Sequence, residues 1–321
     1  MKNIINLIVK DEDKVQRVDV FINNKEDSLS RTRIKNLILK KKLTLNNVVL
    51  EDPSKKVTPG DILKLEIPEP IKTTLNPYNY KLDIIYEDDD LLVINKSAGI
   101  SIHPGAGNYD NTIVNALMNY CGGNLSTIGD ELRPGIVHRI DKETSGLLII
   151  ARTYKSSVYL SKKFKDKNIE KFYLAILNGI PKKTNGIIIS KIKDKKNKDA
   201  VTKYIVLKKI KKRFSFVLLK PETGRKRQIR EHCFELGCPI LGDKKYFKKL
   251  EQNKNIDSNK LFLHAYKLKI IKKDGIKEEF TAPLPDHIRK FCYLYKIPIN
   301  ETFINKFVIS NILKGAKELK N

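Results

Sequence analysis

The chain has 321 residues, enough for about two domains that each bury a core. Lysine and arginine number 63 against 37 acidic residues, and the net charge of +26 points to nucleic acid, although biased genome composition supplies part of the lysine. No run approaches the ~20 apolar residues of a membrane span, and the amino terminus lacks a secretion-signal cleavage site. We therefore expect a soluble, cytoplasmic protein without membrane contact.

The four cysteines do not predict a metal centre. Cys121, Cys233, Cys238 and Cys292 form no C-x-x-C pair and have no histidine at the spacing of a zinc module. His232 is adjacent to Cys233, but neighbouring residues point to different faces of a helix. We expect reduced thiols in or near the core and no bound metal.

The first part of the chain predicts a small α+β unit. Helices are expected at residues 14–22 and 30–43, and strands at residues 43–50 and 57–67. In the second helix one face is apolar, with Ile34, Leu37 and Ile38. The other face is basic and carries Arg31, Lys35 and Lys42. We interpret this basic face as an RNA-binding surface; an ordinary solvated surface is the alternative for a helix taken by itself.

Several short motifs of this unit fit a known module. They are Arg17-Val18-Asp19, the helix start Ser30-Arg31, and Gly60-Asp61 before the last strand. Residues 12–68 resemble the alpha-L RNA-binding domain of some ribosomal proteins, tyrosyl-tRNA synthetases and RNA-modifying enzymes. The chain departs from that pattern at residues 40–42, where a glycine is usual, and at Asn46-Asn47, where Asn-Gly is usual. We therefore expect a different hairpin turn.

Residues 69–80 predict a linker, and residues 81–300 predict a larger domain. Strands are expected at residues 82–86, 91–95, 147–151, 172–177, 202–207, 214–220 and 261–270, with helices at 113–120, 156–167 and 228–236. Charge runs at residues 191–198 and 208–213 are typical of loop tips or strand ends. The basic tail at residues 301–321 is either a helix that packs on this domain or a loose segment that contacts RNA.

The segment H-R-I-D-K-E-T-S-G-L-L-I-I-A at residues 138–151 is the strongest candidate for chemistry. Asp141 lies in a polar turn that leads into an unbroken aliphatic strand, which predicts a strand with both faces buried. A reactive group on such a turn is held more rigidly than one on a free loop. The alternative is that Asp141 caps the turn or pairs with Arg139 or Lys142 in solvent.

Three further segments accompany this one in the same order as in a known family. They are residues 88–108, D-D-D-L-L-V-I-N-K-S-A-G-I-S-I-H-P-G-A-G-N; residues 171–175, K-F-Y-L-A; and residues 219–246, which include T-G-R-K-R-Q-I-R-E-H and Gly242-Asp243. Together they resemble the catalytic domain of the pseudouridine synthases that modify large-subunit ribosomal RNA and some transfer RNA, from about residue 81 to 290. The fold class this resemblance implies is α+β, with a mixed, mainly antiparallel sheet.

The resemblance assigns roles to four residues and requires no cofactor, because the isomerisation neither oxidises the uridine nor adds a group to it. Asp141 is the carboxylate that acts at the ribose, as a nucleophile at the anomeric carbon or as a base at the neighbouring carbon. Arg230 keeps it charged, Tyr173 stacks on the uracil and offers its hydroxyl for proton transfer, and Arg139 occupies the gap left by the flipped base. Read without the resemblance, Arg230 belongs to a solvated basic helix start.

Two positions depart from the family pattern. Lys226 and Arg227 stand where a hydroxyl residue and a histidine are usual, and Ser97 stands where a proline is usual. We expect a local loop change without loss of activity. The basic residues Arg225 and Arg227 are assigned to RNA binding.

The sequence thus predicts a monomeric, two-domain RNA pseudouridine synthase that acts on large-subunit ribosomal RNA or a pre-ribosomal particle. Two alternatives remain open at this point. The substrate is a transfer RNA or another ribosomal site, or the chain is a non-enzymatic RNA-binding or ribosome-assembly factor on the same fold.

Overall fold

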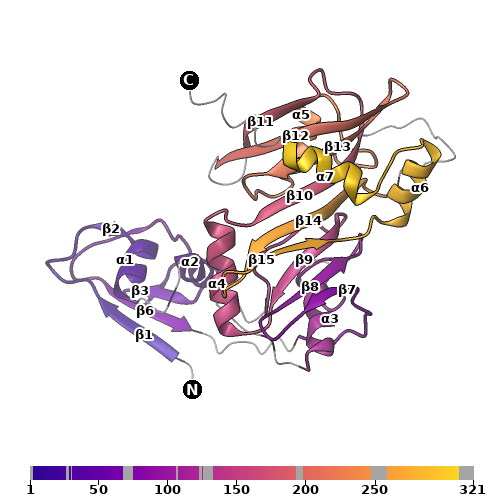
Figure 1. Cartoon of the computed structure of the whole chain (residues 1–321). Coiled ribbons are helices and arrows are strands. Elements are labelled where there is room, and N and C mark those ends of the chain that lie inside the picture. The colour runs from indigo at the N-terminus through magenta and orange to yellow at the C-terminus, as the bar shows by residue number, and fades with distance from the viewer. Residues whose placement is uncertain are drawn as a thin grey trace. The chain divides into compact units, whose positions relative to one another are not determined.

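The computed structural model describes residues 3–26, 29, 31–67, 75–105, 108–122, 125, 133–192, 198–246 and 259–310. The chain divides into two compact units, Met1–Thr74 and Leu75–Asn321 (Figure 1). The finer predicted boundaries, at residues 12–68, 69–80, 81–300 and 301–321, stay a prediction. Within the described parts no helix has the length and apolar character needed to cross a membrane.

The amino-terminal unit combines two small sheets with two helices. Its four-stranded sheet has the order β1-β6-β3-β4 and a second sheet pairs β2 with β5. The strands are β1 (Asn3–Ile8), β2 (Gln16–Arg17), β3 (Leu43–Leu45), β4 (Val48–Val49), β5 (Lys56–Val57) and β6 (Ile62–Ile67), and the helices are α1 (Val18–Lys25) and α2 (Arg31–Leu39). Strand β1 was not expected from the sequence, and the first helix begins later than predicted because residues 16–17 pair with β5.

Two turns of this unit account for the departures noted in its sequence. After α2, Lys41 takes φ 61°, its N–H donates to Ile38 O, and the N–H of Lys42 donates to Leu37 O. This is a Schellman motif, in which lysine replaces the usual glycine. In the β3–β4 hairpin Asn46 and Asn47 have φ 50° and 65°, so a turn with two left-handed residues forms without glycine, because asparagine tolerates this conformation.

The second unit is built on one large sheet. Nine strands form it, in the order β11-β12-β13-β10-β14-β9-β8-β7, with β15 paired to β14. The pairing of β14 with β9 is parallel and the other strand pairs recorded for this sheet are antiparallel. The strands are β7 (Ile84–Glu87), β8 (Leu91–Lys96), β9 (Ser145–Ala151), β10 (Glu170–Asn178), β11 (Asn185–Ile192), β12 (Lys198–Ile210), β13 (Phe214–Pro221), β14 (Leu263–Ile271) and β15 (Lys277–Thr281). The predicted α+β class with a mixed, mainly antiparallel sheet is confirmed.

Strands β8 and β9 are buried on both faces, which the aliphatic run at residues 147–150 predicted for β9. Leu148 and Ile150 belong to the same core cluster as residues of α3 (Ile113–Tyr120), whereas Leu147 and Ile149 pack in a second cluster with Leu160 of α4 (Tyr154–Lys165). The two-residue repeat of a strand sends alternate side chains to opposite faces, so each face needs its own cover. The turn that precedes β9 is therefore attached to a fully enclosed strand.

Several elements escaped sequence analysis because they are short, polar or at an edge. Besides α5 (Gln228–Glu235), which was expected, and α7 (Glu301–Ser310), for which a packed helix was one of two alternatives, the unit has the unassigned strands β11 and β15 and the unassigned helix α6 (Asp286–Leu294). Strand β15, K-E-E-F-T, is a polar edge strand with little hydrophobic signal. Residues 75–80, within the expected linker, contact α3 instead, where the Asn115 side chain donates to Asn76 O.

The start of the carboxyl-terminal stretch packs on this unit. Ile304 of α7 is fully buried, and the buried Lys267 of β14 donates hydrogen bonds to Glu301 and Asn305 at 3.0 and 3.1 Å. Of the two alternatives for this stretch, the structure favours the packed helix for residues 301–305. Residues 311–321 of the expected tail lie outside the described residues.

Candidate active site

The turn that carries Asp141 is clamped by the end of strand β8. The N–H of Thr144 donates to Asp141 O, and Lys142 O accepts from the N–H of Gly99 at 2.9 Å and from Lys96 Nζ at 3.0 Å. The buried Lys96 ammonium also donates to Ser97 O and Ile100 O, and burial lowers its pKa to about 7. A buried cation surrounded by carbonyl oxygens in this way ties the two segments together.

Strand β9 then approaches β14 at a distance that only glycine permits. Gly146 has φ 110°, and a Cβ atom there would lie 2.3 Å from Ala265 O. Beside it Ser145 Oγ lies 2.9 Å from Nδ1 of the buried His264. His264 Nε2 faces Ala282 O, so Nε2 carries the proton and Nδ1 accepts from the serine. The turn of Asp141 is thus fixed by its contacts with the end of β8, and the strand that follows it by its contacts with β14.

Arg230, on α5, is held between two carboxylates. Its Nε and Nη2 donate to Asp243 at 2.7 Å each, while its Nη1 lies 3.6 Å from Asp141 Oδ2. Burial opposes the charge of Arg230, but the hydrogen bonds and charge of Asp243 outweigh it and raise the pKa of Arg230. Asp243 is fully buried and also accepts from the N–H of Lys245. The bidentate pair aims the remaining guanidinium edge at Asp141.

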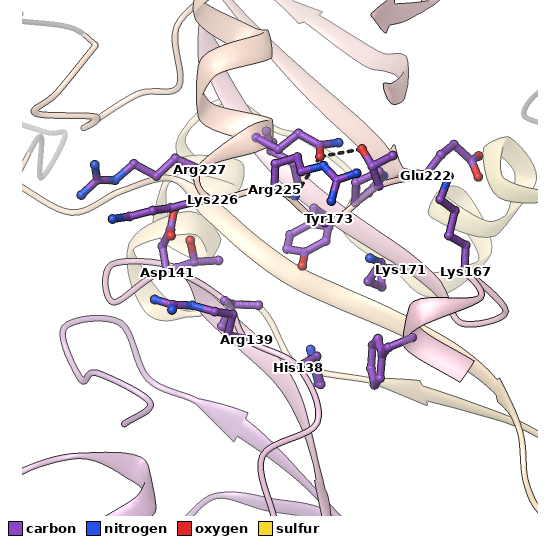
Figure 2. Close-up of a pocket in the computed structure, with 18 of the residues that line it drawn as sticks. His138, Arg139, Asp141, Lys167, Lys171, Tyr173, Glu222, Arg225, Lys226 and Arg227 are labelled. Atoms are coloured by element: carbon purple, nitrogen blue, oxygen red, sulfur yellow. Dashed lines mark hydrogen bonds between the residues drawn. The ribbon is translucent and has the colours of Figure 1, made fainter. Parts of the chain in front are cut away.

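Asp141 lines a pocket of about 530 Å³. The pocket brings together six of the residues singled out from the sequence, namely Asp141, Arg139, Tyr173, Arg225, Arg227 and Arg230. Figure 2 shows Asp141 and Arg139 on one side of the Tyr173 ring, with the basic loop of Arg225, Lys226 and Arg227 along the pocket. Most of the ionisable groups that line it are cationic, as an anionic substrate requires.

Tyr173 reaches this pocket through an irregularity in strand β10. The register of β10 against β14 shifts between Phe172 and Tyr173, and a bulge of this kind re-aims a side chain. The ring is buried, and burial, followed by the charge of Asp141, raises the pKa of the Tyr173 hydroxyl. The hydroxyl therefore remains protonated at neutral pH and is available as a hydrogen-bond donor.

The loop that departs from the family pattern is pinned by Gln228. The Oε1 atom of Gln228 accepts from Thr223 Oγ1 and the N–H of Arg225, and its Nε2 donates to Val201 O and Thr202 Oγ1. Arg227, the residue just before Gln228, has φ 58° at the start of α5. A left-handed arginine stores conformational strain, which residues at functional sites often do. Gln228 thus holds the backbone of this loop with Lys226 and Arg227 in place, and the expected local loop change stays a prediction.

The other residues assigned to RNA binding lie in the amino-terminal unit, outside this pocket. The Nε atoms of Arg17 and Arg31 each donate at 3.0 Å to the buried Asp19 carboxylate, and Lys42 lies 3.5 Å from Glu66. Lys35 is exposed on α2. Lys42 lies beyond the end of α2 at Leu39, although the sequence predicted it on the helix. Of the predicted basic face, Arg31 and Lys35 are on α2, and the buried Asp19 orients Arg31. The role of this face in RNA binding stays a prediction.

Sequence reasoning missed three residues of the site. Asp243, Lys171 and His138 fall inside the quoted segments, yet no role was assigned to them. His138 Nε2 accepts from the N–H of Ile149 at 2.8 Å, and burial, followed by the charge of Lys171, lowers the pKa of His138 to about 3. Only Asp243 had a usable signal, because a buried arginine in a motif requires a carboxylate partner.

His232, weighed earlier as a metal ligand, is a structural residue. Its Nδ1 and Nε2 lie 2.8 Å from Thr202 Oγ1 and 3.1 Å from Ser190 Oγ. Burial raises the pKa of the adjacent Cys233 thiol, which keeps it protonated and inert.

Comparison with known proteins gives a consistent result over both units. The RNA pseudouridylate synthase family model matches residues 90–235, and the S4 domain model matches residues 16–63, which confirms the predicted amino-terminal RNA-binding domain. The ribosomal large subunit pseudouridine synthase D of Zymomonas mobilis is 36% identical over 85% of this chain and 92% of its own. An uncharacterized RNA pseudouridine synthase of Bacillus subtilis, YlyB, is 36% identical over 88% of this chain and 95% of its own.

Solved structures agree with these matches. The human RNA pseudouridylate synthase domain containing 4 protein superimposes with a TM-score of 0.55 and 25% sequence identity, and the match covers 67% of this chain and 93% of that one.

Proposed function

Since the chain belongs to the RNA pseudouridine synthase family, we propose that it isomerises specific uridines of large-subunit ribosomal RNA, with Asp141 acting on a uridine turned out of its stack. The enzyme is thus an isomerase. The ribosomal target is supported by the large-subunit function named for several relatives, by the amino-terminal RNA-binding domain and by the net charge of +26.

The observation that carries this proposal is the position of Asp141. Its carboxylate lies 3.6 Å from the Arg230 guanidinium in a pocket that it shares with Tyr173. The reaction breaks the bond from uracil N1 to ribose C1′ and forms a bond from uracil C5 to the same carbon. The C5 hydrogen leaves as a proton, and N1 takes up a proton. The carboxylate acts either by attack at C1′ or by removal of the C2′ proton.

Arg230 and Tyr173 prepare the site for this chemistry. The Arg230 guanidinium lies 3.6 Å from the Asp141 carboxylate and stabilises its negative charge. Burial favours the protonated form of the Tyr173 hydroxyl, so in this proposal the ring stacks on the uracil and the hydroxyl donates a hydrogen bond.

Arg139 is the candidate for holding the RNA open. It is exposed, lines the pocket beside Asp141, and follows His138 in the same turn segment (Figure 2). Flipping a nucleotide costs a few kcal/mol of unstacking energy, and a planar guanidinium that occupies the gap can stack there in place of the base.

The direct test replaces Asp141 by asparagine, which keeps the size and removes the charge. We expect the rate of pseudouridine formation on large-subunit ribosomal RNA to fall by more than about 10²-fold. Release of tritium from uracil C5 measures the reaction, because that position loses its hydrogen. Full activity of Asp141→Asn would exclude Asp141 as the reacting carboxylate.

Glu143→Gln is the matched control, since Glu143 is an exposed carboxylate in the same turn. We expect it to retain full activity. Pseudouridine maps of cellular RNA with and without the protein identify the target. A site lost only from transfer RNA would refute the ribosomal substrate, and tight ribosomal RNA binding without any pseudouridine would refute the enzymatic role.

A further inference from the structure

The pocket extends past Tyr173 into a second region, away from Asp141. This region is lined by His138, Phe164, Lys167, Lys171 and Glu222, and we call it the Lys171 lobe. Figure 2 shows Lys171 and Lys167 across the Tyr173 ring from Asp141, with His138 below them in the view. The proposed chemistry at Asp141 uses none of these five side chains.

Lys171 is a partly buried cation, and the carboxylate nearest to it in the lobe, Glu222, is not in ion-pair contact with it. Among the described residues no hydrogen bond or ion pair reaches its ammonium group, whereas the carboxylate of Glu222, which acts on it through space, is 3.2 Å from Lys203 Nζ. Burial lowers the pKa of Lys171, and Glu222 opposes this only in part. A half-buried ammonium in this position is destabilising unless an anion joins it.

His138 cannot satisfy Lys171, because it presents a second donor. Its Nε2 already accepts the hydrogen bond from Ile149, so the proton of the neutral ring is on Nδ1. The ring is fixed by stacking on Phe164, with centroids 4.3 Å apart and planes 19° apart. The Lys171 lobe therefore offers an ammonium and an imidazole N–H in a rigid setting, with Arg225 on the loop above.

Two donors and a net positive charge select an anion with several acceptor oxygens. The family's substrate provides one next to every nucleotide. We propose that the Lys171 lobe binds the phosphodiester on one side of the target uridine, with Lys171 supplying the charge and His138 Nδ1–H a hydrogen bond. This inference rests on the proposed function. Anchoring that phosphodiester fixes the attached ribose, whose C1′ must meet Asp141.

The first experiment measures binding of short stem–loop RNAs in which a single phosphate near the target uridine is replaced by an uncharged methylphosphonate. The nucleotide on its 5′ side carries a 2′-O-methyl group for stability, as does the matched reference RNA. We expect the methylphosphonate at one position next to the target uridine to weaken RNA binding to the wild-type protein by about 10-fold or more. The same replacement should have no further effect on Lys171→Met, because the charge partner is already gone.

The second experiment follows tritium release from unmodified RNA. We expect Lys171→Met to be slowed about 10-fold or more, Lys171→Arg to recover part of the rate, and Lys277→Met, at an exposed lysine on strand β15, to match wild type. Unfolding curves of the four proteins show whether each is folded. If Lys171→Met does not fold, Lys171→Gln replaces it, and the wild-type methylphosphonate series stands by itself.

The subsite is refuted if no single flanking methylphosphonate weakens RNA binding to the wild-type protein more than the others do. It is also refuted if Lys171→Met loses as much affinity as the wild type at the same position. Wild-type turnover of the unmodified RNA is measured in the same series. A failure of the subsite is therefore distinguishable from a failure of the proposed function, which would abolish that turnover.

Discussion

Arg230 serves two carboxylates at once, and the division of its nitrogens determines the geometry at Asp141. Asp243 takes Nε and Nη2, which leaves Nη1 for Asp141 at 3.6 Å. Without Asp243 the guanidinium would turn toward Asp141 alone or toward solvent. Asp243 is therefore a positioning residue that acts through Arg230 and does not touch substrate.

Replacing Asp243 by asparagine tests this role. Loss of one charge from a buried pair should lower the free energy of unfolding by about 3 kcal/mol, and displacement of Arg230 should slow tritium release by about 10²-fold. RNA affinity should be unchanged, since Asp243 is fully buried. A variant that is destabilised but retains the full rate would show that Asp243 is only structural.

At the scale of elements, the helix end at Lys41 depends on a conformation that lysine adopts at a cost. The residue is left-handed, with φ 61°, and among the described residues its side chain pairs only with the exposed Glu51. Such surface pairs contribute little, whereas a left-handed L-residue costs roughly 1 kcal/mol. Glycine at position 41 should therefore stabilise the helix end more than the native lysine does.

Lys41→Gly should stabilise the end of α2 by about 1 kcal/mol. The measurement is hydrogen exchange of the Lys42 amide, which bonds to Leu37 O and should exchange more slowly. The matched control is Lys40→Gly, one position earlier, where φ is not positive and glycine should only loosen the helix. Equal slowing in both variants would contradict the argument.

The junction of β9 and β14 should make the protein sensitive to acid. Burial, opposed in part by the hydrogen bond to Ala282 O, lowers the pKa of His264 to about 4 from its ordinary 6.5. The folded protein therefore binds this proton less readily than the unfolded chain. Stability is complete above pH 6.5 and falls as the pH drops toward 4, by up to about 3 kcal/mol for this residue.

Urea unfolding at pH 7 and pH 4.5 measures this loss. A His264→Gln variant, which cannot titrate, should be less stable at pH 7 but should lose less stability between the two pH values. An identical pH dependence in the variant and the wild type would assign the acid sensitivity to other groups, such as His138 or His232, whose pKa values are also lowered by burial.

For the whole molecule, a net charge of +26 predicts that RNA affinity falls as the salt concentration rises. If the enzyme contacts six or more phosphates, its affinity should fall by at least about 10³-fold between about 50 and 200 mM salt. Removing one phosphate contact with Lys35→Ala should reduce the slope of log K against log salt by about 0.9. Lys277→Ala should not change it, and equal slopes for all three proteins would remove Lys35 from the RNA-binding surface.

Local features of the chain were readable from the sequence because they reside in contiguous segments. Residue order and the repeats of strands and helices, 2.0 and 3.6 residues, predict these features. They are the turn of Asp141, the enclosed strand after it, the four ordered motifs and the basic face of α2. Polar or edge elements such as β15, the helix end at Lys41 and the hairpin turn at Asn46 escaped because their hydrophobic signal is weak and their conformation is stabilised by the rest of the unit.

The sequence by itself determined the family, the reacting carboxylate to test and the kind of partner. Only the tertiary structure decided which groups surround that carboxylate. Asp243 reaches Arg230 across 13 residues, His264 reaches Ser145 across 119, and Lys171 meets His138 only where β10 passes the turn before β9. Electrostatic and hydrogen-bond partners act over a few ångströms in space, and chain distance carries no information about them until the sheet has formed.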